Sequence, residues 1–172
     1  GKILREAEMV HISSRFLNQA QKTNESLSPK DNLLEIQIIL WNGYVSYKQR
    51  NYLKAYDLIM SSYKSLCVLD PENKKHRVLF SEINDKLGRC VREYAKSGDN
   101  SADFPNSPLR KMDRKRLVLE ALHHFFLGYL SANKEGNYYR LAESYLSYVI
   151  LFSYKELQDV LEEILNNIEG ST

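Results

Sequence analysis

The sequence predicts an all-α protein built as a stack of antiparallel helical hairpins, with about seven helices. Three observations lead to this fold class. Apolar residues recur at spacings of three and four over long stretches, as in helices that bury one face. Glycine and proline are scarce among the 172 residues, at 7 and 4, whereas all-β folds need many turns. The connections are mostly short, and short links make antiparallel neighbours.

The individual elements follow from where this pattern starts and stops. We expect a fourth helix that starts at Asp70 and Pro71, because aspartate caps free amides and proline fits the first helical position. Ser153 and Glu156 predict a capping box at the last helix. Residues 97–112 contain many turn formers and predict a surface loop. The predicted helices span residues 2–22, 33–49, 52–69, 71–96, 113–134, 138–152 and 153–168.

The composition fits one globular domain over residues 1–172. Hydrophobic residues make up 43% and charged residues 27% of the chain. The net charge of +2 is too small to indicate a nucleic-acid-binding protein from the overall field. No motif for a nucleophile, a phosphate-binding loop or a zinc site is present. We therefore expect neither an enzyme nor a cofactor.

The expected compartment is intracellular, cytoplasmic or nuclear. No apolar run is long enough for a membrane span, and charged residues near the start break any signal peptide. Cys67 and Cys90 lie in apolar helical stretches, so we expect two reduced core thiols rather than a disulfide. The sequence does not begin with methionine, which favours a segment of a longer protein.

One stretch combines small and aromatic residues at fixed offsets around a polar turn. Gly43 and Tyr47 precede the turn, Tyr52 and Ala55 follow it, and Leu-Asp-Pro ends the unit at Pro71. This stretch resembles the tetratricopeptide repeat (TPR) over residues 38–71. The resemblance implies a TPR-like α-solenoid, in which small residues let two helices approach closely and the aromatic residues fill the space at the turn.

A looser match covers residues 125–150. Gly128 precedes a turn, and Tyr139 and Ala142 then follow the same pattern with one residue added before the turn. The middle of the chain does not fit the repeat, so an irregular helical bundle that imitates it locally remains the alternative. Repeats that clamp chaperone tails carry asparagine after the small residue. Tyr44 and Tyr129 stand there instead, so that clamp is not expected.

Twelve tyrosines suggest a binding surface, because tyrosine joins a large apolar ring to a hydrogen-bonding tip and is enriched in interfaces. Core packing with the hydroxyl at the surface is the alternative. The leading hypothesis is a non-enzymatic scaffold or adaptor that binds a peptide or helix of a multi-subunit complex. Its oligomeric state cannot be inferred from the sequence. The candidate partner-binding residues are Trp41, Tyr44, Tyr129, Tyr145 and Tyr148.

Two Glu-x-x-His pairs suggest a different function. Glu8 with His11, and Glu120 with His123, each share one helix face and could chelate a metal ion. A helical-bundle metal-binding module or enzyme is therefore the second hypothesis, although exposed polar residues explain the pairs as well.

A basic cluster lies at the start of the fifth helix, where the helix dipole disfavours positive charge. This conflict suggests an acidic or phosphate-bearing partner, and nucleic-acid binding is the weakest hypothesis, since no aromatic residues are interleaved. The alternative is a solvated surface. The cluster comprises Arg110, Lys111, Arg114, Lys115 and Arg116.

Overall fold

A computed structural model describes residues 2–97 and 104–169, together with the side chains of residues 9–97 and 104–167. The described residues form seven α-helices and two short 3-10 helices, and contain no strand, which confirms the all-α fold class. The helices are α1 (Lys2–Ser26), α2 (Asn32–Lys48), α3 (Tyr52–Cys67), α4 (Lys74–Ser97), α5 (Arg114–Lys134), α6 (Tyr138–Phe152) and α7 (Gln158–Glu169), and the 3-10 helices are η1 (Pro108–Lys111) and η2 (Lys155–Leu157).

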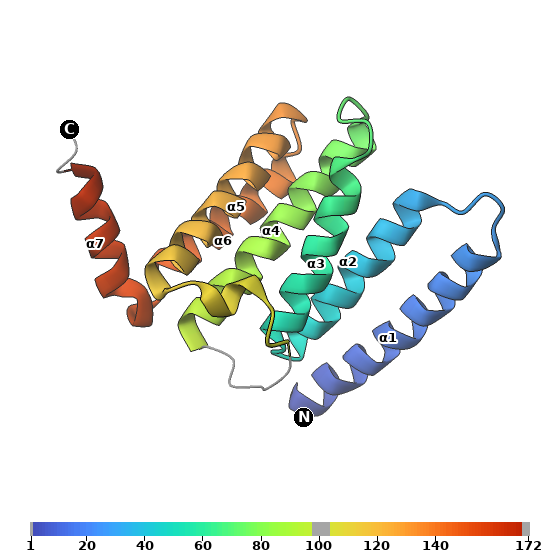
Figure 1. Cartoon of the computed structure of the whole chain (residues 1–172), viewed down its shortest axis with the longest axis horizontal. Coiled ribbons are helices and arrows are strands. Elements are labelled where there is room, and N and C mark those ends of the chain that lie inside the picture. Colours follow the sequence, from blue (N-terminus) through green and yellow to red (C-terminus); the bar gives the residue numbers. More distant parts are fainter. Residues whose placement is uncertain (1, 98–103, 170–172) are drawn as a thin grey trace.

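The helices form a stack in which each of α1 to α6 packs chiefly on its neighbours in the chain (Figure 1). Helix α4 lies in the middle and contacts α2, α3, α5 and α6. Helix α1 packs on α2 at one edge, and α7 lies at the other edge, against α5 (Figure 1). One core extends from α2 to α7, and its largest fully buried side chains include Phe125, Leu40, Leu53 and Ile59.

Side-chain caps explain why four helices begin where they do. Asp31, Asn51, Asp113 and Asn137 each accept a hydrogen bond from the backbone amide three residues ahead, at 2.8 to 3.1 Å. These caps satisfy amides that have no partner within the helix. The starts of α2, α3, α5 and α6 agree with the predicted starts to within one residue.

Two predicted helix starts are wrong. The Asp70 carboxylate accepts from the Glu72 amide at 2.9 Å, which closes a turn, and α4 begins only at Lys74. An aspartate can bond its own neighbouring backbone in a turn as readily as it caps a helix. Ser153 ends α6, where its hydroxyl donates to the Ile150 carbonyl at 2.7 Å, and η2 then precedes α7.

The segment predicted as a surface loop partly joins the core. Residues 98–103 lie outside the described residues. Beyond them, Leu109 in η1 is fully buried, and the Ser107 hydroxyl donates to Asp57 of α3 at 3.0 Å. Cys90 is buried as predicted, but Cys67 is exposed at the end of α3.

The first hairpin packs as the repeat pattern implies. A Cβ atom built on Gly43 would lie 2.5 Å from Cγ1 of Ile59 and 3.2 Å from the Ala55 carbonyl, so only glycine permits this approach of α2 to α3. Ala55 is fully buried, and the rings of Tyr47 and Tyr52 lie 5.9 Å apart beside the turn. A packing contact thus explains a glycine in a helix interior.

The second hairpin differs from the predicted register by one residue. Its turn is capped by Asn137 as the first is by Asn51, so Tyr138 rather than Tyr139 corresponds to Tyr52. Tyr139 and Ala142 are exposed instead of filling the hairpin. The close approach involves Gly128, whose added Cβ would lie 3.2 Å from the Ser144 hydroxyl and 3.3 Å from the Ser81 carbonyl of α4.

Candidate interaction surface

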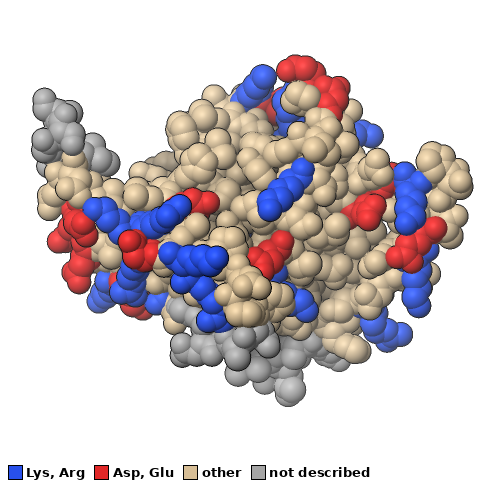
Figure 2. Space-filling model, in the orientation of Figure 1, with Lys and Arg blue, Asp and Glu red and all other residues tan. Residues whose placement is uncertain are grey.

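Helices α5 and α6 carry most of the exposed apolar surface. Ten of the seventeen large apolar side chains exposed in the described residues belong to these two helices. We call six of them the α5–α6 face: Phe126, Tyr129, Leu130, Tyr145, Tyr148 and Val149. Leu119, Tyr138, Tyr139 and Leu146 are the other four. Figure 2 shows an uncharged surface over the middle of α5, in agreement with this composition.

The geometry of the hairpin brings the two halves of this face together. Gly128 lies against Ser144, so the antiparallel helices are level at these two residues. Phe126 and Leu130 on α5 then lie at the height of Tyr145 on α6. Ser144 and Ser147 point inward and are buried, which leaves Tyr145, Tyr148 and the residues beyond them outside. The face therefore spans two adjacent helices.

The five predicted partner-binding residues fall into two groups. Tyr129, Tyr145 and Tyr148 belong to the α5–α6 face, with exposed fractions of 38, 62 and 43%. Trp41 is 41% exposed on α2, and Tyr44 is half-buried beside it. Because α4 lies between α2 and α6, the two groups do not form one surface.

The aromatic residues of α2 contact one another and α4. The rings of Trp41 and Tyr44 meet edge to face at 5.6 Å, and Tyr44 stacks on Tyr47 at 5.6 Å. The Lys86 ammonium of α4 lies 4.8 Å from the Trp41 ring and 4.5 Å from the Tyr44 ring. Such cation–π contacts stabilise partly buried lysines by about 1–2 kcal/mol. Tyr44 is thus engaged within the molecule.

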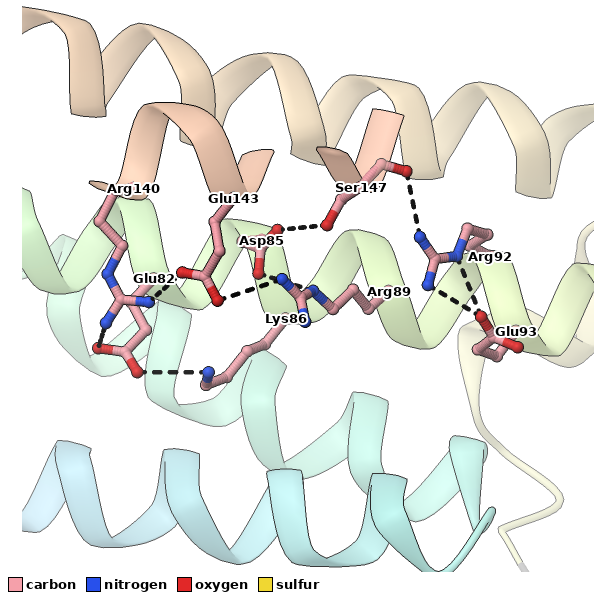
Figure 3. A network of polar contacts seen from close by, with 9 residues as sticks. All are labelled: Glu82, Asp85, Lys86, Arg89, Arg92, Glu93, Arg140, Glu143 and Ser147. Atoms are coloured by element: carbon pink, nitrogen blue, oxygen red, sulfur yellow. Dashed lines mark hydrogen bonds and ion pairs between the residues drawn. The ribbon is translucent and has the colours of Figure 1, made fainter. Parts of the chain in front are cut away.

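A network of charges, in part fully buried and in part half-buried, joins α4 to α6 (Figure 3). Arg140 of α6 pairs with Glu82 at 3.0 Å, and Glu82 in turn pairs with Lys86 at 3.3 Å. Arg89 bridges Asp85 at 2.8 Å and Glu143 of α6 at 3.3 Å. Buried ions require such partners because desolvation is costly.

The network continues toward the end of α6. The Ser147 hydroxyl donates to Asp85 at 2.9 Å, and Arg92 donates to the Ser147 carbonyl at 3.1 Å. Arg92 also pairs with Glu93 at 2.9 Å, and Glu93 accepts from the Tyr154 hydroxyl at 2.6 Å. The four acids and four bases of the network balance in formal charge, so α4 can be buried without a net charge.

Burial controls the ionisation of this network. Burial raises the pKa of Asp85, although Arg89 and the hydrogen bond from Ser147 act in the opposite direction. Burial alone would lower the pKa of Arg89, but Asp85 and Glu143 raise it overall. Burial, together with the hydrogen bond to Glu93, raises the pKa of Tyr154 to about 12.

Sequence reasoning missed the network. Its residues are charged, and charged residues are normally exposed, so the pattern in α4 resembles an ordinary solvated face. The charged residues at positions 82–93 all lie outside the apolar stripe of Ile83, Leu87 and Val91, as they would on a solvated face. The local sequence therefore carries no signal that this side of the helix is buried.

Part of the basic cluster has structural partners. Arg114 donates to the carbonyls of Ala95 at 3.1 Å and Lys96 at 3.5 Å, at the negative end of α4. The predicted conflict with the α5 dipole is thereby offset by the dipole of another helix. Lys115 pairs with Glu163 of α7 at 2.6 Å. Figure 2 shows Lys and Arg side chains intermingled with acids in this region.

Two of the other basic residues line a shallow hollow. Lys111 and Arg116 surround a space of about 260 Å³ together with Asn106, Pro108 and Met112. Arg110 is exposed beside them and does not line it. The hollow is open to solvent, and no buried polar group of the described residues points into it.

The Glu-x-x-His pairs do not converge. Glu120 contacts His124 at 3.4 Å rather than His123, and its hydrogen bond with His124 lowers the pKa of Glu120. His11 is exposed on α1, and the Glu8 side chain lies outside the described side chains. Among the described residues, no three His, Cys, Asp or Glu side chains come together as a metal site.

Comparisons with known proteins give no relative. Protein-family models, curated protein sequences and solved structures were compared, and none matches the chain. Over the described part of the chain, no helix combines the length and the apolar character needed to cross a bilayer.

Proposed function

We propose that this chain is a non-enzymatic, TPR-like interaction module that binds another protein through the α5–α6 face. One observation carries the proposal: an uncharged, largely aromatic surface remains exposed on two adjacent helices. Exposed apolar patches of several hundred Å² on soluble proteins usually mark interaction sites.

The chemistry of the face favours a helix or a helical surface as the bound element. Two antiparallel helices present apolar side chains to both sides of the line where they meet. A partner helix with apolar residues at spacings of three and four would pack between them. The rings of Tyr129, Tyr145 and Tyr148 supply contact area at little entropic cost, and their hydroxyls can bond at the rim.

The α2 aromatic residues have a different role in this proposal. Tyr44 and Trp41 hold the Lys86 ammonium and thereby join α2 to α4. We assign them to the stability of the stack, and we assign partner binding to the α5–α6 face.

A capture experiment with a matched control tests the proposal. The wild type is compared with a Phe126→Ser/Tyr145→Ser double variant and with a Phe16→Ser variant. Phe16 is 72% exposed on α1, so it controls for the loss of an exposed aromatic residue elsewhere. Proteins cross-linked to the wild type and to Phe16→Ser should be lost from the double variant. Equal recovery by a folded double variant, checked by circular dichroism, would refute the assignment.

A further inference from the structure

We propose that the occupant of the α5–α6 face is a second copy of this chain, docked face to face about a two-fold axis. This inference rests on the proposed function, because it names the partner of the same surface. Three properties of the face support it: its lack of charge, its area and its position on a helical hairpin.

The lack of charge makes the face compatible with itself. In a two-fold interface each surface meets its own copy, so a charged patch would face like charges. All six members of the α5–α6 face are uncharged. Arg140 and Glu143 of α6 pair with each other at 2.6 Å and with residues of α4. Tyrosine hydroxyls can both donate and accept, so they also suit an interface that repeats itself.

The exposed area approaches what a stable dimer needs. Six aromatic residues on the outside of the two helices, the four of the α5–α6 face together with Tyr138 and Tyr139, are 38 to 80% exposed. At roughly 200 Å² for each aromatic side chain, the four on the face present about 400 Å² and all six present about 700 Å². A standard interface covers about 800 Å² on each partner, and Leu119, Leu130, Leu146 and Val149 add further area.

The hairpin supplies a suitable geometry. Two α5–α6 hairpins that meet through their outer faces would form a four-helix arrangement. Its interface would consist of helices packed on helices, which is the kind of contact that also holds the chain together. Two-fold dimers are the commonest oligomers, so this assembly needs no special architecture.

The other exposed apolar stripe of the described residues is smaller. Met9, Ile12 and Phe16 lie on a flank of α1 that α2 does not cover. Pairing of this stripe with the α5–α6 face of another copy would be head to tail and open-ended. With three residues it offers far less area than the α5–α6 face offers to itself, and it provides the matched control.

Sedimentation equilibrium of the purified chain tests the inference. The wild type should change from 20.1 kDa to twice that mass as its concentration increases, and no further. Tyr145→Glu and Phe126→Glu each place two carboxylates inside the interface and should weaken dimerisation at least about 30-fold. Phe16→Glu should dimerise like the wild type. Melting curves of the variants verify that they are folded.

Several results would overturn the inference. They are a wild type that stays monomeric at about 200 μM, a folded Tyr145→Glu variant that still dimerises, a mass that increases beyond two copies, or a dimer lost in Phe16→Glu. A monomeric wild type whose α5–α6 face still captures another protein would end the dimer inference alone. A face that contacts neither its own copy nor another protein would end the proposed function as well.

Discussion

Arg50 and Gly136 have the same left-handed backbone conformation, with φ of 63° and 62°, at corresponding positions of two helix-connecting turns. The amide before each cap also bonds alike: Arg50 donates to Tyr47 at 2.9 Å, and Gly136 donates to Asn133 at 3.0 Å. The capping residues Asn51 and Asn137 then donate to carbonyls at 3.0 Å in both turns. One local structure thus closes both hairpins with different residues at its strained position.

Arg50→Gly should stabilise the chain. A side chain at positive φ costs about 1 kcal/mol, and glycine relieves that cost. Arg50 is exposed, so little packing is lost. We expect the free energy of unfolding in urea to increase by about 0.5–1 kcal/mol. Gly136→Ala is the reciprocal control and should decrease the free energy of unfolding by about 1 kcal/mol. This loss comes from backbone strain alone, because nothing lies within 4 Å of the new methyl. Equal stabilities for Arg50→Gly and the wild type would contradict the strain argument.

Gly43→Ala should destabilise the chain although alanine favours helices. The new methyl would lie 2.5 Å from Ile59 Cγ1, and Ile59 is fully buried. Overpacking of this kind costs about 1–3 kcal/mol, which exceeds the gain of about 1 kcal/mol in helix propensity. Urea denaturation measures the change.

A double-mutant cycle with Ile59→Ala identifies the cause. Removing the Ile59 side chain opens space for the methyl, so Gly43→Ala should be tolerated better in that background. Additive effects of the two substitutions would show that the helix approach at Gly43 is not limiting.

The sequence predicts the helices well because their patterns are local. The starts at Asp31, Asn51, Asp113 and Asn137 depend on residues within one turn. The predicted register of the second hairpin is wrong by one residue, because either Tyr138 or Tyr139 could occupy the first tyrosine position after the turn. Choosing between them requires the packing of Gly128 on Ser144 and Ser81, which is a long-range contact.

The candidate surface could be predicted only in part. An abundance of tyrosine indicates a surface, and Tyr129, Tyr145 and Tyr148 are indeed on one. Phe126 and Val149 are residue types that are usually buried. Their exposure depends on which side of each helix meets α4, and the sequence alone does not show that side. The buried charges of α4 were not predicted for the same reason: their partners Arg140 and Glu143 are remote in sequence.

Removing one charge of a buried ion pair should lower the free energy of unfolding more than removing both charges of that pair. Arg89→Gln leaves the carboxylate of Asp85, whose side chain is only 2% exposed, without its cation. Breaking a buried pair in this way typically costs about 3–5 kcal/mol. The Asp85→Asn/Arg89→Gln variant removes both charges and should recover part of that loss. Urea unfolding of the single and double variants measures it, and a double variant no more stable than Arg89→Gln would contradict the pairing.

Asp85 should also make stability depend on pH. Burial raises its pKa in the folded chain above the unfolded value of 3.8. The folded state therefore holds the proton over a window in which the unfolded state has released it. The stability that this bound proton contributes is fully present below the pKa of Asp85 in the unfolded chain, and it is lost as pH rises through the pKa of Asp85 in the folded chain. The wild type should accordingly lose stability relative to Asp85→Asn as pH rises across this window. The unfolding free energy of the wild type minus that of Asp85→Asn should therefore fall with pH. A difference that stays constant or increases with pH would contradict this sign.

Arg114→Ala should weaken the junction of α4 and α5. The guanidinium donates to two carbonyls at the end of α4, and charge-assisted bonds to a helix end contribute about 1 kcal/mol at partly exposed sites. Arg116→Ala is the matched control, because Arg116 lies in the same cluster and is exposed beside an open hollow. The melting temperature should decrease for Arg114→Ala and should hardly change for Arg116→Ala. Equal decreases would indicate that the whole cluster acts through its net charge.

The two cysteines should react at very different rates. Cys67 is exposed at the end of α3, whereas Cys90 is fully buried in α4, where burial raises the pKa of its thiol. Disulfide exchange requires an accessible thiolate, so the native chain should release one equivalent of colour from a thiol reagent quickly. The second equivalent should appear only as the chain unfolds, because opening around Cys90 breaks the contacts of α4 with its neighbours. Cys67→Ser should abolish the fast phase and keep the slow one, whereas two fast equivalents in the native wild type would show that α4 is not the packed centre of the stack.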